Sequence, residues 1–228
     1  MNDDQRIGGA VPRAGEPFFN APWPVVALVT MLAGLHLARV MLRLPPDPFA
    51  FTAEDLAAHR WLGLLTYQFV HVGWLHLLFN VAATLAFGAP VARLMGEGVP
   101  GWRDASAFLL FFVVCGVVAA LGFIPVAGSS NWALVGCSGA ASGLVGATTR
   151  IMQGRGRLGA LFGGTVMRMT VGWIIINAVF GLTGLTPGAG GGPVAWQAHI
   201  IGYFAGLLLI GVFIRLAGRP DGDHALAP

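Results

Sequence analysis

Six stretches of this chain are apolar over the whole length that a helix needs to cross a membrane, which is about 17 to 25 residues. Hydrophobic residues make up 56% of the 228 positions and charged residues only 10%, and the mean hydropathy is +0.73. A soluble domain carries about 25% charged residues. The pattern therefore predicts an all-α membrane protein built as a bundle of six transmembrane helices. The six stretches are residues 24–42, 74–94, 105–124, 132–152, 166–183 and 195–216.

The bundle forms a single predicted domain over residues 24–217, because no repeat or composition break divides it. A short N-terminal segment, 1–23, precedes it and a short tail, 218–228, follows it. All 13 basic residues are arginine. Ten of them lie before, between or at the ends of the spans on the side of the two termini, so the positive-inside rule predicts that both termini are cytoplasmic. The other three are Arg39, Arg43 and Arg60.

Charge and cysteine content exclude several classes of function. The formal net charge of +3 is small and the arginines are scattered, so we expect no nucleic-acid partner. The two cysteines, Cys115 and Cys137, show no metal-ligand spacing and are expected to be small buried residues rather than a disulfide or a zinc site. We expect no metal and no cofactor. We expect membrane lipids to be partners of the protein.

Two loops on the side away from the termini are unusual. The first, residues 43–73, becomes amphipathic over 54–65, so this part can lie in the membrane interface with Trp61 turned toward lipid, although an ordinary loop would also fit. The second, Gly184 to Val194, is rich in glycine and proline and is expected to form a flexible flap.

Four polar residues lie inside the predicted spans, where polar side chains are costly and therefore mark candidate functional sites. They are His76 and Asn80, four apart on one helix face, and Ser138 and His199. Each one alone could equally well be an interhelical hydrogen-bond partner. Four of them at a similar depth on three helices are harder to explain by packing.

Ser138 lies in a run of small residues, between Gly136 and Gly139, and this run has two interpretations. Its glycines could bring two helices into close contact, or they could clear space around a nucleophilic serine. His199 has Gly202 and Gly206 on its own helix face. If the two helices pack through these glycines, His199 comes within hydrogen-bond reach of Ser138 and can act as its general base.

The chain between residues 105 and 220 contains no carboxylate, so the sequence predicts a serine–histidine dyad without an aspartate. The oxyanion formed by attack needs hydrogen-bond donors. Asn80, His76 and the backbone N–H of Ser138 could supply them. The remaining intramembrane polar residues are assigned to packing or helix contacts; they are His36, Thr84, Ser142 and Asn177.

Three motifs in these segments resemble those of the rhomboid intramembrane serine proteases. The run from His71 through His76 to Asn80 resembles the family's H-x4-H-x3-N signature. Residues 136–139 resemble its G-x-S-G motif, and residues 198–206 its A-H-x2-G-x3-G motif.

The resemblance implies a serine endopeptidase of the bacterial inner membrane that cleaves transmembrane protein substrates within or beside their membrane segments. It implies that Ser138 is the nucleophile and His199 the general base, and that His76, Asn80 and Ser138 form the oxyanion hole. His71 is implied to be structural, together with the motif glycines Gly136, Gly139, Gly202 and Gly206.

One departure from the family pattern affects the site. Four residues after the serine, where the family often has a tyrosine that stacks on the histidine, this chain has Ser142. The sequence thus leaves open what holds His199 in place. Two other functions stay open as alternatives: a non-catalytic rhomboid-like protein that escorts transmembrane clients, and a small-solute transporter. The transporter is disfavoured because no carboxylate lies at mid-membrane.

Overall fold

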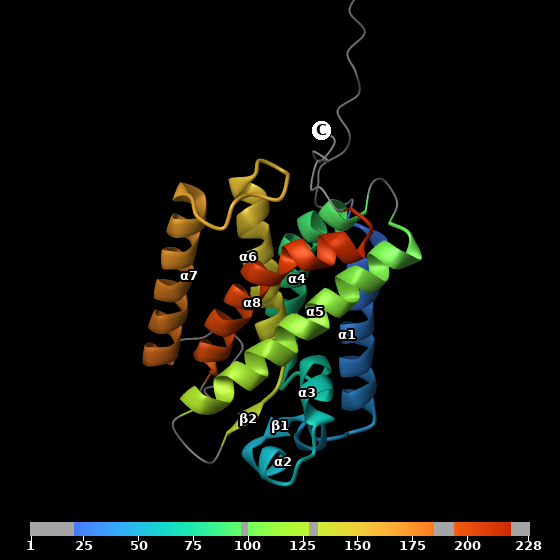
Figure 1. Cartoon of the computed structure of the whole chain (residues 1–228). Helices are drawn as coiled ribbons and strands as arrows, with labels where there is room; N and C mark the ends of the chain where they lie inside the picture. The colour runs from blue at the N-terminus through green and yellow to red at the C-terminus, as the bar shows by residue number, and fades with distance from the viewer. Residues whose placement is uncertain (1–20, 97–99, 128–131, 185–193, 220–228) are drawn as a thin grey trace, which may run out of the picture.

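The computed structural model describes residues 21–96, 100–127, 132–184 and 194–219, and it is a bundle of long helices with a small cap of short elements at one end (Figure 1). The long helices are α1 (Trp23–Met41), α4 (Trp74–Met95), α5 (Trp102–Phe123), α6 (Ser138–Gln153), α7 (Gly164–Thr183) and α8 (Trp196–Leu216). The short elements are η2 (Asp47–Phe49), β1 (Phe51–Thr52), α2 (Ala53–Ala57), α3 (Gly63–Thr66), η3 (Tyr67–Phe69), η4 (Ile124–Val126) and β2 (Ala133–Leu134).

Five helical stretches in the described residues are long and apolar enough to cross a membrane, as expected of an integral membrane protein. They are α1, α4, α7, α8 and the stretch Trp102–Val126, which extends α5. The predicted span at 132–152 differs from the structure. Its helix, α6, begins only at Ser138 and has 16 residues, because residues 133–134 form strand β2 instead.

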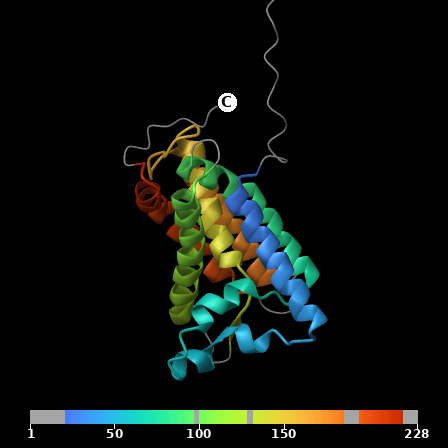
Figure 2. The ribbon, with the colours of Figure 1, turned by 90° about the vertical axis from the view of Figure 1, so that its right-hand side faces the viewer.

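Helix α6 is the centre of the bundle. Every residue from Gly139 to Thr149 is buried, and α4, α5, α7 and α8 pack around the helix (Figures 1 and 2). Its hydroxyl groups donate to carbonyl oxygens: Thr148 to Phe87 and Thr149 to Val145, both at 2.9 Å. Since α6 is enclosed by protein, it tolerates small polar residues that a lipid-facing helix would not.

The contact between α6 and α8 is made by glycines, as predicted. A Cβ atom on Gly202 would overlap the carbonyl oxygen of Gly139, and one on Gly206 would overlap that of Gly143. The small-residue stretch therefore allows the backbones of α6 and α8 to come into direct contact.

The cap differs from the single amphipathic stretch expected at 54–65. Two short helices, α2 and α3, are separated by a turn in which His59 adopts a positive φ of 56°. Strand β1 pairs antiparallel with β2, matching Phe51 with Leu134 and thereby joining the cap to the segment just before α6. The cap lies below the ends of the long helices in both views (Figures 1 and 2).

Trp61 and Leu62 are exposed on the cap. The expectation of a flexible flap at Gly184 to Val194 falls mainly on residues 185–193, outside the described part of the chain, as do most of the two predicted terminal segments.

Candidate active site

The turn before α6 is shaped by Gly136, which adopts a φ of +99°, a conformation that residues with a side chain rarely take. A Cβ atom here would lie 2.6 Å from Cε1 of His76, so the glycine also makes room for that ring. The backbone N–H of Gly136 donates to the carbonyl of Tyr67 at 2.8 Å, and the hydroxyl of Tyr67 donates to the carbonyl of Gly116 at 2.7 Å. These bonds fix the backbone just before Ser138.

Ser138 is the first residue of α6, so its backbone N–H has no acceptor within the helix. Its Oγ lies 2.8 Å from Nε2 of His199, in the first turn of α8. Both residues are half-buried. Because an imidazole nitrogen at this distance can take the hydroxyl proton, the pair has the geometry of a nucleophile and its general base.

The other ring nitrogen of His199 has a partner that the sequence did not identify. Nδ1 lies 2.9 Å from Oδ1 of Asn177, on α7, and Asn177 is 5% exposed. The sequence pattern assigned Asn177 to packing, and this contact gives it a second role. Its signal was present in the sequence: a single amide inside the apolar run 174–180, where an unpaired amide is costly. What the sequence lacked was the packing of α7 against the start of α8.

Ser142, where the family often has a tyrosine, is occupied within its own helix. Its hydroxyl donates to the carbonyl of Ser138 at 2.7 Å. This bond gives Ser142 no part in holding the imidazole.

His76 and Asn80 lie on α4, which packs against α6. The ring of His76 lies against Gly136, two residues before Ser138. Asn80 is buried, and its Nδ2 donates to the carbonyl of His76 at 2.9 Å. An amide nitrogen carries two hydrogens, so one N–H of Asn80 is left for another acceptor.

His71, which lies next to His76 and Cys137, is fully buried. Its Nε2 is 3.5 Å from Sγ of Cys137, and its ring centroid is 5.2 Å from that of His76. Burial, reinforced by neighbouring imidazoles and the Arg39 guanidinium, lowers the pKa of His71 to about 3. The ring is therefore neutral at physiological pH and packs as an uncharged side chain.

Arg39 is one of the three arginines that do not lie on the side of the termini, and it supports His71. Its guanidinium donates to the carbonyls of Leu44 and His71, both at 2.9 Å. It thereby ties the end of α1 to the first loop and to the segment that leads into α4.

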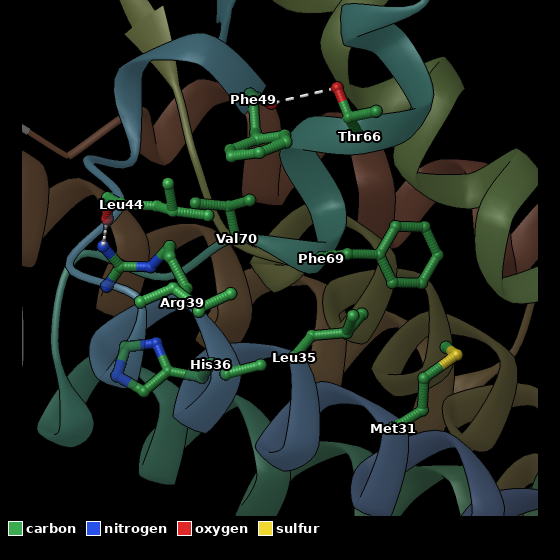
Figure 3. A pocket seen from close by; sticks show the side chains of 11 residues that line it. Met31, Leu35, His36, Arg39, Leu44, Phe49, Thr66, Phe69 and Val70 are labelled. Carbon is green, nitrogen blue, oxygen red and sulfur yellow. Dashed lines mark hydrogen bonds between the residues drawn. The ribbon is translucent and has the colours of Figure 1, made fainter.

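An apolar pocket of about 390 Å³ lies between α1 and the first loop (Figure 3). Arg39 and His36 line it together with side chains such as Met31, Leu35 and Phe69. Ser138 and His199 do not line it, so this pocket is separate from the candidate active site.

Among the described residues, no group of three or more His, Cys, Asp or Glu side chains is arranged to hold a metal ion. The hydroxyl of Ser138 and the imidazole of His199 can act as nucleophile and base, with backbone and side-chain N–H groups nearby as hydrogen-bond donors.

Two comparisons with known proteins bear on this site. A family model described as Rhomboid domain matches residues 58–216. The chain is also similar to Rhomboid protease GluP of Bacillus subtilis (strain 168), with 34% identity over 99 residues. That match covers 40% of this chain and 18% of the length of the relative.

Proposed function

Because this chain belongs to the rhomboid family, whose domain covers residues 58–216, we propose that it is an intramembrane serine endopeptidase. Its substrates are membrane proteins, cleaved within or beside their transmembrane segments. The observation that carries the proposal is the 2.8 Å contact between Ser138 Oγ and His199 Nε2.

In the first half of the reaction, Ser138 Oγ attacks the carbonyl carbon of the scissile peptide bond while its proton passes to Nε2 of His199. The tetrahedral intermediate then collapses. The C–N bond breaks, the imidazolium returns its proton to the leaving amine, and the acyl group stays on Ser138. A water molecule, deprotonated by His199, hydrolyses this ester and regenerates the serine hydroxyl.

The oxyanion of each tetrahedral intermediate needs donors that are already in place. Ser138 supplies its backbone N–H, which has no intrahelical acceptor at the first position of α6. We assign the remaining donors to the His76 ring, which lies against Gly136, and to the free N–H of Asn80. His71 acts as a support for His76 rather than as a donor.

The protein works in this proposal as a six-span bundle in a bacterial inner membrane, with both termini in the cytoplasm. Helix α6 is the fourth of these spans in chain order, shorter than the others because neighbouring helices enclose it and the cap covers the chain just before it. The cap and the start of α6 then face the extracytoplasmic side, where a substrate helix would unwind to expose a peptide bond.

The test is cleavage of a membrane-anchored reporter in liposomes by wild type, Ser138→Ala and the control Ser106→Ala, whose serine is exposed on α5. We expect wild type and Ser106→Ala to cleave, and Ser138→Ala to be inactive with an unchanged thermal unfolding midpoint. Cleavage by Ser138→Ala would overturn the assignment. A wild type that binds the reporter without cleaving it would favour the escort function.

A further inference from the structure

We propose that Asn177 is a positioning residue that fixes the tautomer and the ring orientation of His199. The site then operates as a hydrogen-bonded chain from Ser138 through His199 to Asn177. This inference rests on the proposed function. It answers what holds the imidazole in a chain that has neither a carboxylate nor an aromatic ring at the places where one would be expected.

The direction of the Asn177 amide follows from its second contact. Nδ2 donates to the carbonyl of Trp173 at 2.9 Å, one turn earlier on α7. The amide oxygen is thereby turned toward Nδ1 of His199, 2.9 Å away. An amide oxygen can only accept, so Nδ1 must carry the hydrogen. The lone pair of the neutral ring is then on Nε2, which faces the Ser138 hydroxyl.

Asn177 reaches His199 because α7 and α8 meet in three successive layers. The rings of Trp173 and Tyr203 stack with centroids 6.0 Å apart. One turn along, Asn177 meets His199. One turn further, Gly181 leaves the space that the Trp196 ring occupies, since a Cβ on Gly181 would overlap that ring.

The burial of α7 points the same way. This helix stands at one edge of the bundle (Figure 1), and Val166 and Asn177 are its buried residues. An edge helix that buries an amide while most of its apolar side chains are more exposed is not explained by packing alone. The amide is explained if its oxygen is required by the base.

The experiment compares three variants in liposomes. Asn177→Leu keeps the approximate size but removes the acceptor, and Asn177→Asp keeps an acceptor oxygen at the same position. Thr170→Val is the matched control, because it removes another α7–α8 hydrogen bond, the 2.9 Å contact between Thr170 Oγ1 and the Tyr203 hydroxyl. We expect Asn177→Leu to lower kcat about tenfold or more with little change in KM, because the imidazole loses its orientation. Asn177→Asp should restore most of kcat, and Thr170→Val should leave it unchanged.

A second readout does not depend on activity. In protein labelled with [15N]histidine, the one-bond Nδ1–H cross peak of His199 is identified by its loss in His199→Ala. It should disappear in Asn177→Leu and persist in Thr170→Val. An unchanged kcat and a retained cross peak in Asn177→Leu would overturn the inference, and so would equal losses in Asn177→Leu and Asn177→Asp with the cross peak retained in both. If Ser138→Ala cleaves as well as wild type, the proposed function itself fails, which separates the two outcomes.

Discussion

The Cα atom of Gly202 lies so close to the backbone of Gly139 that a methyl group on Gly202 would overlap the Gly139 carbonyl oxygen. The same relationship recurs one turn along between Gly206 and Gly143. Two helix backbones in direct contact leave the side chains at their ends only short distances to span. The contact between Ser138 and His199 at 2.8 Å is a consequence of this packing.

Alanine at Gly202 should therefore force α8 away from α6. We expect Gly202→Ala to lower the free energy of unfolding by about 1–3 kcal/mol, the usual cost of overpacking. We also expect the rate of cleavage to fall by more than the loss of folded protein alone would explain. Thermal unfolding in detergent and reporter cleavage measure the two effects. Gly172→Ala on α7 is the control, because no atom lies within 4 Å of its new methyl group. A Gly202→Ala protein as stable and active as wild type would contradict the close packing.

Loss of an oxyanion donor should slow the reaction without preventing it. We expect Asn80→Ala and His76→Ala each to lower kcat by about 10² to 10³, the range found for single donors in other hydrolases. Ser138 should still react slowly with a fluorophosphonate, since nucleophile and base are intact. Steady-state kinetics in liposomes measure the effect, and an unchanged kcat in either variant would remove that residue from the assigned oxyanion hole.

The buried His71 should make the fold sensitive to acid. The unfolded chain protonates this side chain near its ordinary pKa of about 6.5, whereas the folded protein keeps it neutral down to about 3. The unfolded state therefore binds more protons below pH 6.5, and stability is lost as the pH falls. For this residue the loss between pH 7 and pH 5 is about 2 kcal/mol.

The measurement is the difference in thermal unfolding midpoint between pH 7 and pH 5, for wild type and for His71→Leu. The variant should show a smaller difference, because a leucine side chain does not titrate. Equal differences would mean that the pKa of His71 is the same in the folded and unfolded protein, so that burial does not lower it.

Arg39 should stabilise the first loop. We expect Arg39→Met to leave the carbonyls of Leu44 and His71 without their donor. The free energy of unfolding should fall by about 1–3 kcal/mol. Limited proteolysis of the 43–73 loop should then be faster. Arg43→Met, at the neighbouring arginine, is the comparison and should leave proteolysis unchanged. The assignment fails if the two variants are cleaved at the same rate.

The sequence predicted most of the bundle because its signals are local. Apolar runs set five helices to within a few residues, and glycine spacing predicted the α6–α8 contact. The start of α6 was misplaced because the pairing of Phe51 with Leu134 joins segments that are far apart in the chain. The cap was simplified for the same reason. Its short elements are held by contacts between distant residues, such as that of Tyr67 with Gly116, and they are too short to show a periodic pattern of apolar residues in the sequence.

The candidate site divides in the same way. Ser138, His199, His76 and Asn80 were visible because each is a polar residue in an apolar segment and the four share a similar predicted depth. Asn177 is also a polar residue in an apolar segment, but its role depends on how α7 lies against α8, which no local pattern encodes.

The central claim is that Ser138 is a nucleophile activated by His199, and covalent labelling tests it most directly. Wild type, Ser138→Ala and His199→Ala in liposomes are treated with a fluorophosphonate probe, and the modified peptide is identified by mass spectrometry. We predict one adduct in wild type, on Ser138, and none in either variant. Absence of an adduct on Ser138 in wild-type protein that cleaves a membrane-anchored reporter, or equal labelling of Ser138 in His199→Ala, would contradict the account.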